Sequence, residues 1–165
     1  MLIYRARHNP VMRLWHEDLL SALDRQRLLA QHRECCALRG KGWGRKHSTV
    51  DYVFRHPPCR LYAYHLRVMS EMTGRGYRTS QAWYLPSYRG SLPPRRIAMP
   101  SPKSWGDRIF PEHDDAYLAE CLMLLRDKGA ELADGTTAEE RLLKMAVESP
   151  EAVAAAEIRL AARGK

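Results

Sequence analysis

Apolar side chains recur every three or four residues along residues 25–39, which is the spacing of the buried face of an amphipathic helix. Asp24 precedes this stretch and can act as the N-cap, and Gly40 is typical of a helix end. The predicted inward face consists of Leu28, Leu29, His32, Cys35 and Cys36. Gln31 and Glu34, three residues apart, share a different and more polar face.

A stronger pattern of the same kind covers residues 59–76 and predicts a second long helix. Its buried stripe is predicted to contain Leu61, His65, Val68 and Met72. A short helix is expected just before it, and two consecutive prolines end that short helix.

The second half of the chain predicts three more helices. One begins near Asp114 and stops at Gly129, and two short helices follow it in the tail. Thr137 and Glu140 have the spacing of a capping box for the first of these two. Ser149, followed by a proline, opens the second.

Residues 77–105 contain five prolines and are predicted to be irregular. No stretch shows the alternation of a β-strand, and no internal repeat is present. These patterns predict an all-α fold, a compact single-domain helical bundle with a C-terminal helical extension. We divide the chain into a leader (residues 1–11), a helical domain (residues 12–129) and the extension (residues 130–165).

The chain of 165 residues carries a net charge of +8, which is unevenly distributed. Residues 1–100 hold 18 Lys and Arg against 6 Asp and Glu, whereas residues 101–165 hold 9 against 13. A basic body of this kind favours a polyanionic partner, and nucleic acid is the commonest one. A basic protein with no such partner has the same composition, so charge alone does not decide.

Several functional classes lack their signals in this sequence. No apolar run reaches the roughly 18 residues that a membrane span needs, and the leader "MLIYRARHNP" has no apolar core of a secretion signal. The four cysteines are predicted to be free thiols in a reducing cytoplasm. No P-loop, nucleophile elbow or metalloprotease motif is present.

Two groups of residues could bind or cleave a nucleic acid. Arg33 and Glu34 stand side by side in the first predicted helix, where the guanidinium would keep the carboxylate ionised and reach a phosphate. A solvated helix face explains that pair equally well. The second group lies in the glycine-rich loop "GKGWGRKHS" and consists of Lys41, Arg45, Lys46 and His47. Trp43 in this loop could stack on an unpaired base or fold onto the core.

A zinc site is an alternative for two other pairs of residues. His32 with Cys35, and His56 with Cys59, each have an H-x-x-C spacing, and four such side chains could close a tetrahedral site. The spacing is not that of a standard zinc finger, and the cysteines of the first helix fit its apolar face as small hydrophobic residues.

The segments "MRLWHEDLL" and "DRQRLLAQHRECCALRG" together resemble the pyrimidine-dimer DNA glycosylase family of the phage endonuclease V type. The phage-type pattern is a chain start followed by Arg, then a helix with an Arg-Glu pair. The matching residues here are Met12-Arg13 and Arg33-Glu34. Residues 28–69 and "PEHDDAYLAECL" are similar to a bacterial branch of this family. The resemblance covers about residues 12–129 and is remote to the phage enzyme.

The resemblance implies a glycosylase that removes one base of a UV-induced pyrimidine dimer and then cleaves the strand at the abasic site, with no metal or other cofactor. It implies that the α-amine of the first residue attacks the sugar C1′ and forms an imine. Glu34 would assist this chemistry, and Arg13 and Arg33 would hold the DNA. We expect a monomer that binds double-stranded, damaged DNA in the cytoplasm, associated with the nucleoid.

The chain departs from this pattern at its first residue. Met12 has a free amine only where the chain begins there, and eleven residues precede it. A misassigned start site is the simpler explanation of the leader; cleavage, or folding that brings Met1 to the site, is the other. Without either, Lys41 or Lys46 would have to supply the amine, or the protein is a non-catalytic nucleic-acid-binding protein.

Overall fold

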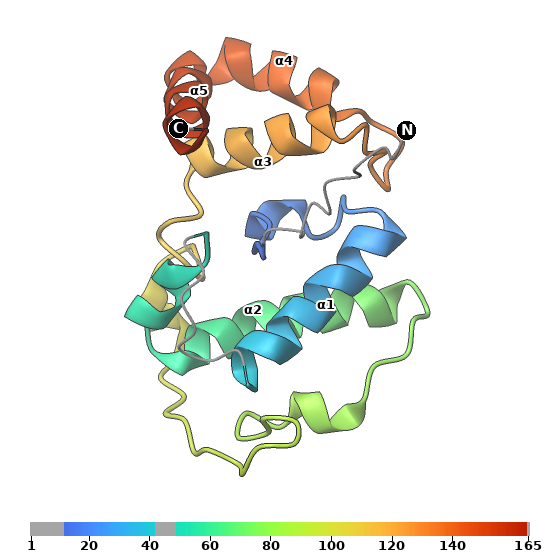
Figure 1. Cartoon of the computed structure of the whole chain (residues 1–165), viewed down its shortest axis with the longest axis vertical. Helices are drawn as coiled ribbons and strands as arrows, with labels where there is room; N and C mark the ends of the chain where they lie inside the picture. Colours follow the sequence, from blue (N-terminus) through green and yellow to red (C-terminus); the bar gives the residue numbers. More distant parts are fainter. Residues whose placement is uncertain (1–11, 42–48, 165) are drawn as a thin grey trace, which may run out of the picture.

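The computed structural model describes residues 12–41 and 49–164, and these residues form a helical fold (Figure 1). The α-helices are α1 (Arg25–Arg39), α2 (Pro58–Gly74), α3 (Asp115–Asp127), α4 (Ala138–Glu148) and α5 (Pro150–Arg163). Short 3₁₀ helices are η1 (Glu17–Leu19), η2 (Asp51–Arg55), η3 (Gln81–Tyr84) and η4 (Pro102–Trp105). The described residues contain no strand, so the predicted all-α fold is confirmed.

Several helix ends form where the sequence predicts them, although α2 spans Pro58–Gly74 and not the predicted residues 59–76. Asp24 accepts a hydrogen bond from the Arg27 amide at 2.9 Å, which satisfies a free N–H of the first turn of α1. The Gly40 amide donates to the carbonyls of the last turn. Thr137 and Glu140 form the predicted capping box of α4, with each side chain accepting from the other residue's amide.

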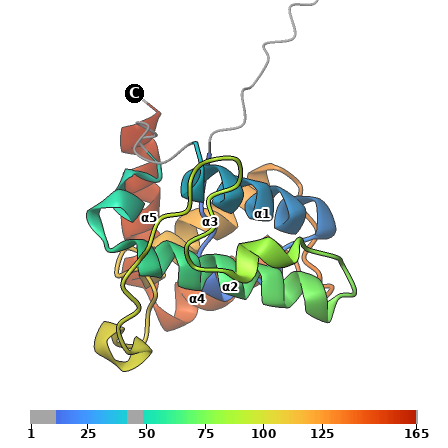
Figure 2. The same cartoon turned by 90° about the horizontal axis from the view of Figure 1, so that it is seen from below.

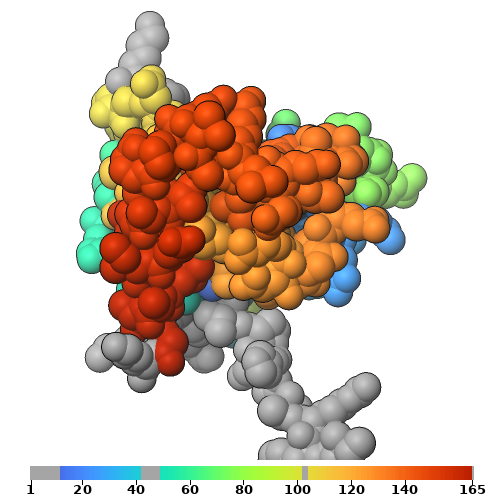
Figure 3. Space-filling model, turned by 90° about the horizontal axis from the view of Figure 1, so that it is seen from above, coloured from blue at the N-terminus to red at the C-terminus, as the bar shows by residue number. Residues whose placement is uncertain are grey.

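Two groups of helices lie on either side of the N-terminal segment (Figure 1). α1 packs on α2, whereas α4 and α5 both pack on α3. Residues 12–24 pass between the groups, and the irregular segment after α2 lies over α1 and α2 (Figure 2). Seen from above, α4 and α5 lie beside α3 on the outer face (Figure 3).

The core is built from the predicted stripe of α2 together with residues from every long helix. Leu61, His65, Val68 and Met72 are all buried, as predicted. The same buried cluster includes Leu14 from the N-terminal segment and Ala156 from α5. No helix of the described residues is long and apolar enough to cross a membrane.

The buried side of α1 differs in part from the predicted inward face. Leu28 and Cys35 are buried as predicted, but Leu29, His32 and Cys36 are only partly buried. Gln31, which we predict on a polar face, has no solvent exposure. The reason is that the N-terminal segment packs against α1 along Gln31, and sequence periodicity cannot detect a neighbour that is not itself a helix.

Candidate active site

Four consecutive carbonyl groups of the extended segment that precedes η1 each accept a hydrogen bond from a different side chain. Counting from Met12, the donors are Thr49, Gln31, Tyr117 and Tyr64. They come from α1, α2, α3 and the turn before η2. An extended chain without a partner strand must satisfy its polar groups in some other way, and here the side chains of the surrounding elements do so. The main chain at Met12 is therefore held from several sides.

The same segment is fixed further along by buried histidines. The Glu17 amide donates to Nδ1 of His113 at 3.1 Å, so Nε2 of His113 carries its proton and faces the Tyr52 hydroxyl at 2.7 Å. His16 donates from Nε2 to the His113 carbonyl at 2.8 Å. Burial lowers the pKa of His113 to about 2, so this ring is neutral and structural.

Glu34 lies on α1, next to the start of this segment. Its carboxylate accepts a hydrogen bond from Gln31 Nε2 at 2.8 Å. Burial raises the pKa of Glu34 to about 7, although the Arg13 backbone amide and the charges of Arg13, Arg33 and Lys128 all act to lower that pKa. Desolvation is therefore the dominant influence on this carboxylate.

This result corrects the expectation that Arg33 keeps Glu34 fully ionised. The Arg33 side chain is exposed, so water screens its charge, while the carboxylate itself is withdrawn from water. A carboxyl group with a pKa of about 7 is protonated in part of the molecules at neutral pH. It can therefore both give and accept a proton there, which an ordinary glutamate cannot do efficiently.

The first residues after the leader lie beside this carboxyl group, as the influence of the Arg13 amide and guanidinium on its pKa shows. The Arg13 carbonyl accepts from Gln31 at 2.9 Å, and its guanidinium lies over the Trp15 ring, 5.8 Å from the centroid. Met12 is partly buried against the core. The residues Met12, Arg13 and Glu34 are thus brought together.

Residues 12–85 match the family model described as pyrimidine dimer DNA glycosylase. This segment, a little under half of the chain, is therefore similar to that family. The match begins at Met12, contains Arg13, Arg33 and Glu34, and ends within the segment that follows α2. No similar protein was found among the curated proteins or among the solved structures.

The glycosylase match does not reach α3, yet α3 contributes to the site. Tyr117 donates to the Leu14 carbonyl, and Lys128, at the end of α3, acts on the pKa of Glu34. Sequence reasoning missed both residues, because neither has a local motif and each reaches the site only through the packing of distant helices. The capping signals of α3 predict the helix but not which of its faces meets the N-terminal segment.

The predicted cationic loop is only partly within the described residues. Lys41 is exposed at the end of α1. Arg45, Lys46 and His47, as well as Trp43, lie outside the described residues. Their assignment as DNA-binding residues stays a prediction.

The four residues considered for zinc do not form a cluster. Among the described residues, the one group of three metal-ligating side chains within reach of each other is instead His32, Cys36 and His65. Arg39 donates to Nδ1 of His65 at 2.9 Å, so Nε2 of His65 carries a proton, which it donates to Nδ1 of His32 at 2.8 Å. These bonds occupy both ring nitrogens of His65 and Nδ1 of His32, so the group forms a hydrogen-bonded cluster.

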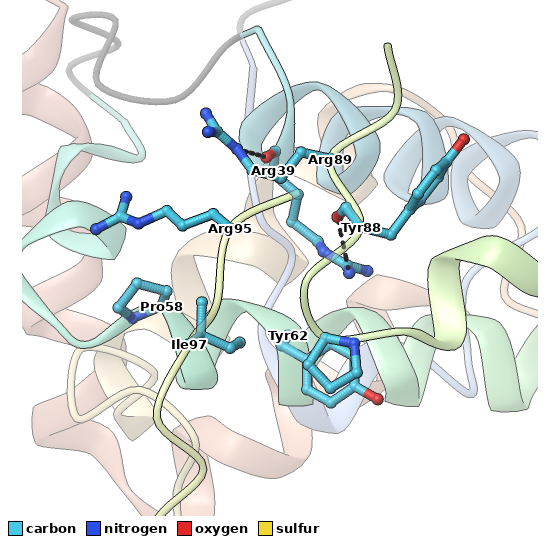
Figure 4. Close-up of a pocket in the computed structure, with 8 residues that line it drawn as sticks. Arg39, Pro58, Tyr62, Tyr88, Arg89, Arg95 and Ile97 are labelled. Carbon is cyan, nitrogen blue, oxygen red and sulfur yellow. Dashed lines mark hydrogen bonds between the residues drawn. The ribbon is translucent and has the colours of Figure 1, made fainter. Parts of the chain in front are cut away.

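Arg39 also organises the irregular segment after α2. Its guanidinium donates to the carbonyls of Trp83, Leu85 and Tyr88, at 2.8, 2.9 and 3.3 Å. It lies over the rings of Tyr62 and Trp83, each at 5.1 Å from the centroid. Figure 4 shows Arg39 beside Arg89 and Arg95 in a cavity of about 30 Å³, where Tyr62, Tyr88 and Ile97 also contribute to the lining.

A larger cavity, of about 340 Å³, begins at Thr49, the residue that binds the Met12 carbonyl. α5 lines it with Arg159 and Arg163, and α3 lines it with Glu120. Glu120 is fully buried and pairs with Arg163 at 2.5 Å and with Arg159 at 3.6 Å. Both arginines are thereby engaged by acidic groups of their own chain.

Proposed function

We propose that this protein is a DNA-repair glycosylase with abasic-site lyase activity, which acts on UV-induced pyrimidine dimers through an imine formed by the α-amine of Met12. One observation carries the proposal: the Gln31 side-chain amide donates both to the Arg13 carbonyl, next to Met12, and to the Glu34 carboxyl group. The match of residues 12–85 to the pyrimidine dimer DNA glycosylase family model supports this substrate class.

An α-amine suits such a step because its pKa is about 7.7–8.0, against about 10.4 for lysine. A far larger fraction of it is neutral, and so nucleophilic, at pH 7. A cation such as Arg13 beside it favours the neutral form further. We propose that the working chain begins at Met12, which is where the family match begins.

In the proposed reaction, the Met12 nitrogen forms a bond to C1′ of the sugar, and the bond from C1′ to the base breaks. The base leaves with the bonding electron pair and takes up a proton, while the amine nitrogen loses one. The C1′–O4′ bond then breaks and O4′ takes up a proton, which opens the sugar ring and leaves the protonated imine between C1′ and the Met12 nitrogen. Removal of a C2′ proton then expels the 3′ phosphate, and water releases the enzyme. Glu34, with its pKa of about 7, is suited to donate and to accept these protons.

The DNA contacts are proposed for Arg13 and Arg33 near the reacting sugar, and for the loop cations Lys41, Arg45, Lys46 and His47. Phosphate binding by these side chains predicts affinity that falls steeply with salt. The target nucleotide must leave the duplex stack, which costs less at a damaged and poorly stacked site.

The test is borohydride trapping with a chain that begins at Met12, on duplexes carrying either a cyclobutane dimer or an abasic site. Reduction of the imine gives a covalent adduct of protein and DNA. The matched control is the chain with all 165 residues retained, in which Met12 has no free amine. If the chain beginning at Met12 gives no adduct on either duplex, the imine mechanism is wrong. Salt-dependent binding without incision would then identify a non-catalytic DNA-binding protein.

A further inference from the structure

Gln31 uses every hydrogen-bonding position of its side-chain amide. Its Oε1 accepts from the Trp15 amide at 2.7 Å and lies 3.0 Å from the Tyr64 hydroxyl, whose single proton it shares with the Trp15 carbonyl. Its Nε2 donates to the Arg13 carbonyl at 2.9 Å and to Oε2 of Glu34 at 2.8 Å. Two acceptor sites and two N–H groups are all that an amide has.

The orientation of this amide is determined by its partners. Rotating it by half a turn would place its NH₂ group against a donor, the Trp15 amide, and its oxygen against two acceptors, the Arg13 carbonyl and the Glu34 carboxylate. Gln31 has no solvent exposure, so water cannot compensate for such mismatches. The side chain is therefore locked in one arrangement before any DNA binds.

Gln31 is also the direct connection between the two parts of the proposed site. One N–H holds the main chain one residue beyond the proposed nucleophile, and the other holds the proposed proton carrier. We propose that Gln31 is a positioning residue, which fixes the Glu34 carboxyl group and the Met12 amine in one reactive geometry. This inference rests on the function proposed above, and adds to it a residue that does not itself touch the DNA.

Other residue types cannot replace this amide at position 31. A glutamate lacks the two N–H groups and would direct a carboxylate at both the Arg13 carbonyl and Glu34. A methionine has a similar length but makes none of the four bonds. The other charged groups that act on Glu34 are Arg13, Arg33 and Lys128, and both substitutions leave these unchanged.

The first experiment measures the rate of borohydride-trapped adduct with the chain beginning at Met12 and its Gln31→Met variant, at saturating DNA. We expect a rate loss on the order of 100-fold, because a small displacement of reacting groups has an effect of that size, and an almost unchanged DNA affinity. The control is Gln26→Met, the same substitution at an exposed position of α1, which should react like the parent chain. Circular dichroism gives the folded fraction for normalisation.

The second experiment has a readout that needs no activity. Carbon-13 NMR follows the titration of the Glu34 carboxyl group in the parent chain and in Gln31→Glu, which keeps the size of the side chain if Gln31→Met fails to fold. We expect the midpoint of Glu34 to rise in the variant, since a second acidic group faces it, and the pH optimum of adduct formation to rise with it.

The outcomes separate the two proposals. A parent chain that gives no adduct overturns the proposed function. A parent chain that gives adduct, with Gln31→Met reacting at the same rate, or with the Glu34 midpoint unmoved in Gln31→Glu, overturns the positioning role while the proposed function stands.

Discussion

Two glutamates in helices of this protein are withdrawn from water, but one is paired with arginines and the other is bonded to a neutral amide. Glu120 on α3 is fully buried and is paired with two arginines of α5, Arg159 and Arg163. Glu34 on α1 forms no ion pair with any Lys, Arg or His side chain of the described residues, and its side-chain partner is the neutral amide of Gln31. Burial therefore raises the pKa of Glu34 to about 7.

The difference shows how one residue type is made structural in one place and reactive in another. An ion pair supplied by the chain itself offsets part of the cost of withdrawing a carboxylate from water and engages it within the fold. A carboxyl group that receives hydrogen bonds but no close counter-charge keeps a proton affinity suited to catalysis near neutral pH.

The largest expected effect is on the chemical step. We expect Glu34→Gln to reduce adduct formation on abasic DNA by about 10²- to 10⁴-fold, the usual contribution of a positioned acid or base. Glu120→Gln should leave the rate per folded molecule unchanged. Single-turnover trapping with the chain beginning at Met12 measures both. Equal losses in the two variants would contradict the assignment of separate roles.

The next effect is on stability. Replacing both Arg159 and Arg163 by alanine leaves Glu120 without its counter-charges, and we expect a loss of about 3 kcal/mol in the free energy of unfolding. Adding Glu120→Gln to that variant should restore most of the loss, since no buried charge then remains. Urea denaturation measures both. Arg126→Ala, which removes exposed ion pairs, is the control and should change stability by less than about 1 kcal/mol.

The next prediction concerns how the free energy of unfolding depends on pH through Glu34. The folded-state pKa of Glu34 is raised above its unfolded value, so the protonated group favours folding. This contribution is complete below about pH 4.5 and is lost as the pH rises through about 7. We expect Glu34→Gln to be more stable than the parent chain by about 3 kcal/mol at pH 8.5 and by almost nothing at pH 4.5. Parallel stability curves for the two proteins would show that Glu34 is not desolvated.

The smallest effect concerns Lys128. Its charge lowers the pKa of Glu34 without a direct contact, so Lys128→Met should move the midpoint of Glu34 slightly upward. NMR titration of the Glu34 carboxyl group detects such a shift. Because the Lys128 side chain is exposed, added salt should reduce the difference between the two proteins.

The sequence predicts the helices well because their signals are local. Asp24 and the Thr137–Glu140 box are capping signals within one helical turn, and both form as predicted. The pair Met12-Arg13 and the pair Arg33-Glu34 are likewise brought together, although only the family resemblance suggested this.

The chemistry of the site was less predictable, because it depends on burial and on contacts between distant segments. The spacing places Gln31 on a more polar face of its helix, yet its side chain is buried and bonds to both parts of the site. The pKa of Glu34 follows from desolvation, which no adjacent residue reveals. Arg33, the conspicuous neighbour in the sequence, has the weaker influence because its side chain points into water.

Arg39 has a consequence for how this protein can change over evolutionary time. It binds the segment after α2 through three main-chain carbonyls, and such bonds are indifferent to the side chains that those residues carry. Leu85 is largely exposed, and the course of its main chain does not depend on its identity. Because one buried arginine fixes the backbone of this segment, its exposed side chains can change without changing the backbone. Substitutions there can therefore adapt the surface to a new partner while the helices beneath it stay the same.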